Sequence, residues 1–248
     1  MRIYLAGRLM VETESGLLDE EDLPARQGRI AFAYLVLNRR RPIPRLELAT
    51  ALWGDSTPEA WEASLSALLS RLRSLFRKLP MDADISSLSG SVHLSLPGDT
   101  WIDLDVARNS LDEAEGLLRA AKPREAWPQA LVCYSIVERG FLHGEEQLWI
   151  VRERERIHNE HLRALELLSD ITLAAGEPAA AVRYARECSD LEPFRESAYE
   201  REMRADMQMG NHAEALRTFE RLRRLLADEL GADPSPALQT AYLRALQG

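Results

Sequence analysis

The sequence predicts a mainly α-helical protein that carries small β elements in its N-terminal part. Apolar and polar residues alternate near the N-terminus and again before residue 102, whereas apolar residues recur at helical spacing through most of the remaining chain. The length of 248 residues suits one large domain or two ordinary ones, and a hydrophobic fraction of 46% suffices for a packed core. We expect one domain over residues 1–102 and an all-helical domain over residues 103–248.

The first elements are predicted to be short strands. Alternation runs through Arg2–Gly7 and continues at Leu9 and Val11, and Glu14–Gly16 is typical of a turn. This pattern predicts a short antiparallel meander.

Three helices are expected next, over Ile30–Leu37, Pro44–Trp53 and Glu59 to about Leu79. The first of them must end before Pro42, because proline cannot continue a helix. The residues of the second helix that we expect to point inward are Leu46, Ala49, Leu52 and Trp53.

A β-hairpin is predicted from Ile85 to Ile102. Its signals are the turn residues Ser89–Ser91, alternation through Val92, Leu94 and Leu96, and a break at Pro97–Gly98. Three helices closed by a hairpin form the pattern of a winged helix-turn-helix DNA-binding domain.

The chain after Asp103 shows helical spacing throughout and contains an internal repeat. Six positions recur 34 residues later: Leu173, Gly176, Ala179, Ala181, Val182 and Leu191 become Met207, Gly210, Ala213, Ala215, Leu216 and Leu225. A period of 34 with glycine at the turn is typical of tetratricopeptide repeats.

Charge is distributed unevenly along the chain. The net charge is −9, yet residues 26–78 contain ten Arg and Lys against four Asp and Glu, whereas residues 108–248 contain 19 against 25. A local basic segment is what binding to phosphates requires. No apolar run approaches the roughly 18 residues of a membrane span. We therefore expect a cytoplasmic protein without a membrane partner, in which Cys133 and Cys188 are buried free thiols.

The third predicted helix has a face of small residues opposite its apolar stripe. At about 100° per residue, the centre of this face is formed by Ala63, Ala67, Ser70 and Ser74. The flanking cations are Arg73 and Arg77 on one side, and Arg71 and Lys78 on the other. Small side chains let a helix enter a major groove about 12 Å wide, where flanking cations meet the phosphates.

Several motifs point to a known family. They are the leucine-rich helix before Arg41–Ile43, the Ala51–Gly54 corner followed by Pro58, the segment Ser70–Arg73, Asp103–Asp105, the tract Leu225–Pro236 and the terminal Leu243–Leu246. With these residues, Arg29–Leu79 resembles the OmpR-type winged helix of Streptomyces antibiotic regulatory proteins. The C-terminal part is similar to the bacterial transcriptional activator domain that those proteins carry.

The resemblance implies a sequence-specific DNA-binding activator, not an enzyme, that binds direct repeats at promoters and needs no cofactor or metal. The implied partners are double-stranded DNA, RNA polymerase, a second copy of the chain, and an effector or protein on the helical domain. The expected DNA-binding residues are Ala67, Ser70, Arg71, Arg73, Ser74, Arg77, Lys78, Arg39, Arg40, Arg41, Arg45 and His93. The loop expected to face RNA polymerase comprises Gly54, Asp55, Ser56, Thr57 and Pro58.

The predicted wing departs from the family pattern, because no Arg or Lys lies between Met81 and Ile102. We therefore expect the wing to contribute less to DNA affinity than the third helix does. This departure and the acidic total charge support an alternative, a tetratricopeptide-type adaptor whose winged helix does not bind DNA. His158 and His161 could hold a metal with Glu155, but their charged amphipathic context favours a solvated surface.

Overall fold

The computed structural model describes residues 1–14, 16–77 and 82–247. The chain divides into two compact units. Unit 1 comprises Met1–Val106 and Arg139–Ile157, and unit 2 comprises Ala107–Glu138 and His158–Gly248. The predicted domain boundary at residue 102 remains a prediction. Within the described ranges, no helix has the length and apolar character needed to cross a membrane.

The first sheet of unit 1 contains four short strands. They are β1 (Arg2–Tyr4), β2 (Met10–Thr13), β3 (Gly16–Leu18) and β7 (Trp101–Ile102). The strand order is β3-β2-β1-β7, so the antiparallel meander that we predicted is confirmed, and β7 adds to it in parallel. Ile3 pairs with Ile102, and both side chains are buried.

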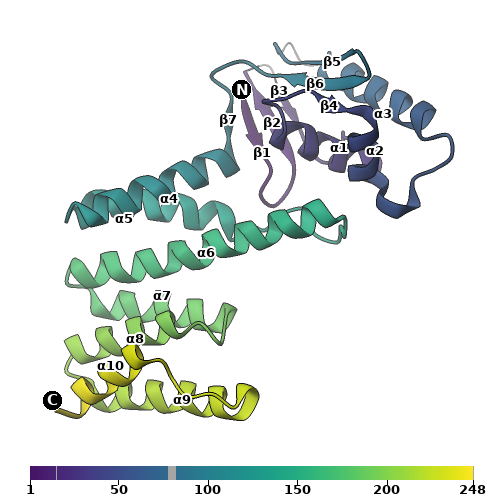
Figure 1. Ribbon diagram of the computed structural model, residues 1–248. Coiled ribbons are helices and arrows are strands. Elements are labelled where there is room, and N and C mark those ends of the chain that lie inside the picture. The colour runs from purple at the N-terminus through teal and green to yellow at the C-terminus, as the bar shows by residue number, and fades with distance from the viewer. Residues whose placement is uncertain (15, 78–81, 248) are drawn as a thin grey trace. The chain divides into compact units, whose positions relative to one another are not determined.

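Three helices and a second sheet complete the winged helix of unit 1 (Figure 1). The helices are α1 (Ala25–Leu37), α2 (Arg45–Trp53) and α3 (Trp61–Phe76), and a short 3-10 turn, η1 (Gly54–Ser56), follows α2. The second sheet has the order β4-β6-β5, with β4 (Ile43–Pro44), β5 (Asp84–Leu88) and β6 (Ser91–Ser95). The mainly α-helical fold with a winged helix-turn-helix is confirmed.

Two details differ from the sequence-based expectation. The hairpin ends at Ser95 rather than Ile102, because Pro97–Gly98 breaks the strand and the next strand pairs with β1 instead of β6. In α2, Leu46 points outward with 61% of its surface exposed, and Leu48 takes the buried position. The inward face of α2 therefore begins two residues later than we predicted.

Asp103 joins the first sheet to the helix that follows it. Its carboxylate accepts hydrogen bonds from the backbone N–H groups of Leu5, Ala6 and Leu104, at 2.9, 2.9 and 2.8 Å. The side chain is fully buried, and burial raises its pKa although the three donors oppose this. A single carboxylate thus accepts hydrogen bonds from the backbone N–H groups that follow β1 and from the first turn of the next helix.

The rest of the chain is helical, as predicted. Its helices are α4 (Asp103–Arg119), α5 (Pro123–Val137), α6 (Leu148–Ala174), α7 (Pro178–Leu191), α8 (Glu196–Gln208), α9 (His212–Leu230) and α10 (Pro236–Gln247). In unit 2, α8 packs against α7, α9 and α10 (Figure 1). The core between them includes Leu165, Tyr199, Met203, Phe219 and Leu222.

The 34-residue repeat corresponds to two equivalent helix turns in unit 2. Gly176 follows α6 and Gly210 follows α8, with φ angles of +83° and +76° that favour glycine. Their N–H groups donate to the carbonyls of Leu173 and Met207, at 3.1 and 3.0 Å. The equivalent alanines that follow, Ala181 and Ala215, are both fully buried. Equal turns and equal close approaches are the physical basis of the sequence repeat.

Candidate nucleic-acid interface

The exposed face of α3 consists of small side chains. Leu65, Leu69 and Leu72 are fully buried on the opposite side, so the orientation of the helix is fixed by its core stripe. The exposed small residues are Ala63, Ala67, Ser70 and Ser74. A helix with such a face can approach a groove closely, because no long side chain holds it away.

Arg71 on α3 and Arg77 at its C-cap have exposed side chains. Arg71, Ser70 and Ser74 line a pocket that Asp22 and Pro24 also border. Arg71 is exposed and, within the described residues, its side chain has no hydrogen bond or ion pair. Arg77 is also exposed, and its Nε donates to the carbonyl of Arg73 one turn earlier, at 3.3 Å. Lys78 was predicted to join them but lies outside the described residues. The free cations of this helix are therefore placed along its last two turns.

Arg73 is engaged by the wing. Its Nε donates to the carbonyl of Ile85 at 2.6 Å, and its Nη2 donates to Ser87 Oγ at 2.6 Å. Both acceptors belong to β5. The sequence placed Arg73 with Arg77 on one flank of the small-residue face, but only the fold shows that its guanidinium is used within the chain.

Arg45 extends from the start of α2 across to α3. Its Nη2 donates to Ser66 Oγ at 2.7 Å and to the carbonyl of Glu62 at 3.2 Å. Ser66 in turn donates to the same Glu62 carbonyl at 2.7 Å. The role of Ser66 could not be predicted from the residue pattern: it holds the Arg45 guanidinium at the edge of the small-residue face.

The three arginines after α1 differ in whether their guanidinium groups are paired within the chain. Arg39 bonds to Asp105, the Arg41 guanidinium binds both oxygens of Glu47 at 2.5 and 3.0 Å, and Arg40 is exposed. Within the described residues, the Arg40 side chain makes no hydrogen bond or ion pair. Arg40 is thus the member of this cluster that is available to an external anion.

A tyrosine completes the pair between Arg41 and Glu47. Tyr34 donates its hydroxyl to Glu47 at 2.6 Å. Burial, followed by this hydrogen bond to a carboxylate, raises the pKa of Tyr34 to about 12. The hydrogen bond from Arg41 holds the pKa of Glu47 below its usual range. This network fixes the turn between α1 and α2.

His93 lies on β6 and contacts the same turn. Its Nε2 is 3.1 Å from the carbonyl of Arg39, so the ring donates its Nε2–H to that carbonyl. The wing strand therefore supports the end of α1. His93 was expected at the nucleic acid, and the structure brings it to the backbone that carries Arg39–Arg41.

Gly54, Asp55 and Ser56 of the loop predicted to face RNA polymerase line a groove of unit 1. The groove, of about 1290 Å³, is lined by α1, α2, η1 and the start of α6. Its exposed apolar side chains include Leu46 and Leu148, 61% and 65% exposed. Trp149 anchors one wall by donating its Nε1–H to the carbonyl of Ala51 at 2.9 Å. The sequence motif indicated the loop, but the prediction missed the α6 residues of the groove because they lie far away along the chain.

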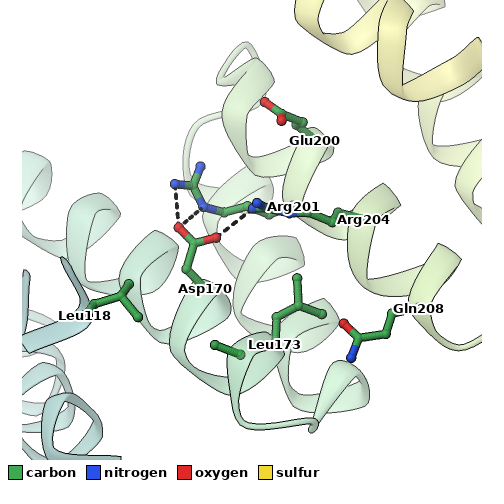
Figure 2. Close-up of a pocket in the computed structure, with 8 residues that line it drawn as sticks. Leu118, Asp170, Leu173, Glu200, Arg201, Arg204 and Gln208 are labelled. Carbon is green, nitrogen blue, oxygen red and sulfur yellow. Dashed lines mark hydrogen bonds and ion pairs between the residues drawn. The ribbon is translucent and has the colours of Figure 1, made fainter. Parts of the chain in front are cut away.

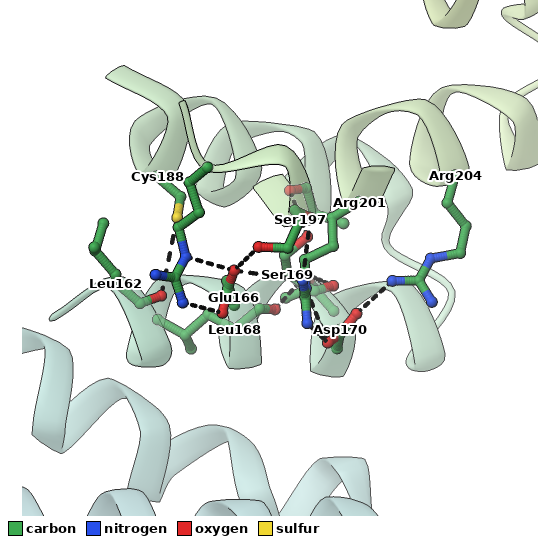
Figure 3. A network of polar contacts seen from close by, with 12 residues as sticks. Leu162, Glu166, Leu168, Ser169, Asp170, Cys188, Ser197, Arg201 and Arg204 are labelled. Atoms are coloured by element: carbon green, nitrogen blue, oxygen red, sulfur yellow. Dashed lines mark hydrogen bonds and ion pairs between the residues drawn. The ribbon is translucent and has the colours of Figure 1, made fainter. Parts of the chain in front are cut away.

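A second, more polar pocket lies in unit 2, between α4, α6 and α8 (Figure 2). Asp170 lies among its lining residues and binds Arg201 at 2.8 Å and Arg204 at 2.7 Å. One helical turn earlier, Glu166 binds Arg195 at 2.7 Å and accepts from Ser197 (Figure 3). Each of these carboxylates on α6 is paired with an arginine from α8 or the residue before it, so the network serves helix packing.

Among the described residues, no group of three or more His, Cys, Asp and Glu side chains could hold a metal ion. His161 is not solvated as its context suggested, since it packs against Tyr134 with the ring centroids 5.5 Å apart. Burial lowers the pKa of His161. Both cysteines are buried free thiols, as predicted.

Comparison with known proteins yields relatives with regulatory roles. The regulatory protein AfsR of Streptomyces coelicolor is 32% identical over 221 residues, covering 89% of this chain and 22% of AfsR. The transcriptional regulatory protein EmbR of Mycobacterium tuberculosis is 25% identical over 224 residues, covering 88% of this chain and 57% of EmbR. The chain thus spans about a fifth of AfsR and just over half of EmbR.

The fold has a solved counterpart. The structure of Mycobacterium tuberculosis EmbR in complex with a low-affinity phosphopeptide matches with a TM-score of 0.80 at 22% identity, covering 99% of this chain and 65% of that chain. The family model described as the bacterial transcriptional activator domain matches residues 102–246. The chain therefore belongs to the bacterial transcriptional activator domain family, whose matched relatives AfsR and EmbR are regulatory proteins.

Proposed function

We propose that this chain is a sequence-specific DNA-binding transcription activator that inserts α3 into the major groove. The observation that carries the proposal is the exposed face of α3, where small residues lie between free arginines. Ser70 and Arg71 then face base edges, whereas Arg77 and Arg40 face phosphates. Hydrogen bonds and apolar contacts to base edges give specificity, and phosphate contacts set register and affinity.

The unpaired cations support this assignment over a protein-binding role for α3. The helix dipole favours cations at the end of α3 in any protein, but it does not require a row of alanine and serine beside them. On DNA, each phosphate contact releases counterions and adds affinity that falls with salt. The wing lacks Arg and Lys in the described range 82–102, so the affinity in this proposal comes from α3 and the turn after α1.

Selection of bound duplexes from a random pool tests this function. We expect a defined site, arranged as a direct repeat, and loss of preference at one base pair in Arg71→Ala. The matched control is Arg183→Ala, an exposed arginine on α7. Recovery of no enriched sequence would favour the adaptor instead.

We further propose that RNA polymerase docks on the groove of unit 1 that Gly54, Asp55 and Ser56 of the predicted loop help to line. Exposed leucines and the exposed Asp55 give this groove an apolar surface with an acidic edge. Leu46→Ser and Asp55→Ala should lower activated transcription while leaving promoter binding unchanged, because neither side chain is buried or lies on α3. Leu17→Ser, at an exposed leucine on β3, is the control.

A further inference from the structure

We infer that Arg73 is a positioning residue, which fixes the wing to the recognition helix instead of binding DNA. The inference rests on the proposed DNA-binding function and gives a different role to one of its arginines. Nε and Nη2 of Arg73 each make a 2.6 Å hydrogen bond to β5, to the Ile85 carbonyl and to Ser87 Oγ. A planar guanidinium holds two acceptors in a fixed relative geometry, which a lysine cannot do.

The acceptors explain why this contact is needed. β5 is the edge strand of the sheet β4-β6-β5, so among the described strands one side of it has no neighbour. An edge strand leaves backbone groups to be satisfied by other means. Arg73 satisfies one of these carbonyls, at Ile85, whose side chain is anchored in the core at 1% exposure.

The other arginines of α3 make no such contact with a strand in the described residues. Arg77 bonds only within its own helix, and Arg71 is exposed without a bond. The N–H groups that Arg73 gives to β5 are withdrawn from any phosphate. Of the three arginines in the last turns of α3 and at its C-cap, two therefore have exposed side chains and Arg73 links the helix to the wing.

The wing needs this link, because it has no cation of its own in the described range 82–102. It turns tightly at Ser89 and Gly90, with φ angles of +51° and +77°, and Leu88 beside the turn is 80% exposed. Without Arg or Lys, such a wing acts on DNA through neutral donors, placement and shape. Arg73 sets that placement relative to α3.

The test compares variants that separate charge from geometry. Arg73→Lys keeps the charge and loses the two-pronged bond, and Ser87→Ala removes one acceptor. Arg77→Gln and Ser95→Ala are matched controls on the same helix and on β6. For each variant, affinity for the selected duplex is measured as a function of salt, and thermal unfolding confirms the folded state.

We expect Arg73→Lys to weaken binding roughly tenfold with an unchanged salt slope, because the loss is geometric. Ser87→Ala should act in the same direction, and the double variant should be no weaker than Arg73→Lys alone. Arg77→Gln should lower the slope by about one. The inference is overturned if Arg73→Lys binds within about twofold of the parent chain and Arg73→Gln lowers the slope by about one.

Measuring amide hydrogen exchange without DNA tests the positioning role of Arg73 independently of the proposed DNA-binding function. Arg73→Gln should accelerate exchange of the amides in β5 and β6, whereas Arg77→Gln should not. Equal exchange in the two variants would overturn the positioning role, whatever the chain binds. A parent chain that binds no duplex would instead refute the DNA-binding function alone.

Discussion

Arg45 on α2 bonds to Ser66 on α3 over 2.7 Å, and this contact carries a cation from one helix of the helix-turn-helix to the edge of the next. The guanidinium is further held by the Glu62 carbonyl. Both of these acceptors are neutral, so the positive charge of Arg45 remains uncompensated by them. The small-residue face of α3 is thereby bordered by a cation that does not belong to α3.

Replacing Arg45 by Gln should weaken binding to all duplexes by a similar factor, since phosphate contacts carry no sequence information. The slope of log affinity against log salt should fall by about one. Fluorescence anisotropy with a selected and a scrambled duplex measures both effects. A loss confined to the selected duplex would show that Arg45 reads a base.

Replacing Arg71 by Ala should cost about 1–3 kcal/mol of binding free energy on the selected duplex and relax the preference at one base pair. Arg71 is exposed, so stability should be unaffected. Competition with single-base variants of the duplex is the measurement. Equal losses on every duplex would contradict a base contact.

Asp103→Ala should lower the free energy of unfolding of unit 1 by about 2–3 kcal/mol, because it leaves buried N–H groups of Leu5 and Ala6 without an acceptor. Asp103→Asn, which keeps one acceptor oxygen, should lose less. Denaturant unfolding followed by tryptophan fluorescence reports the change, since Trp101 precedes this junction. Asp99→Ala, at an exposed aspartate nearby, is the control. A loss of unfolding free energy in Asp103→Ala that is no larger than in this control would contradict the role of the carboxylate.

Glu166→Gln should destabilise unit 2 at neutral pH and make it less sensitive to acid. Burial alone would raise the pKa of Glu166, but the hydrogen bonds from Arg195 and Ser197 outweigh it and hold the pKa below 4.5. A lowered pKa contributes stability above the unfolded value, and that stability is lost as the pH falls through the folded value. We expect a loss of about 1–3 kcal/mol at pH 7 that shrinks below about pH 4.5.

Thermal unfolding across pH 3–8 checks this, with Glu220→Gln as the control. Glu220 pairs with Arg223 on the surface, where such pairs contribute little. A Glu166→Gln variant whose deficit grows on acidification would contradict the assigned direction of the pKa shift.

Much of the fold could be predicted from local patterns. The apolar spacing of α3 correctly predicted that its small-residue face is exposed, because helix periodicity alone decides which side meets the core. The glycines at residues 176 and 210 marked two equivalent turns, because their positive φ angles are a local requirement. Both signals are contained within a few residues of sequence.

Features that depend on distant residues were not predictable in this way. The pairing of Trp101–Ile102 with β1 depends on a strand about 100 residues earlier, with Arg2 opposite Trp101. Arg73 and Arg77 share one flank of the small-residue face, and only the position of β5 separates their roles. Leu46 was assigned inward by spacing, although the turn that begins α2 leaves it exposed.

The central claim is that α3 and the turn after α1 bind duplex DNA through unpaired arginines. Titration of the selected duplex with the full chain at increasing salt tests it most directly. We predict strong binding at low salt, a linear fall of log affinity with log salt, and a slope reduced by about two in the double variant Arg40→Gln/Arg77→Gln. Absence of binding at low salt, or a slope that is the same in the double variant, would contradict the account.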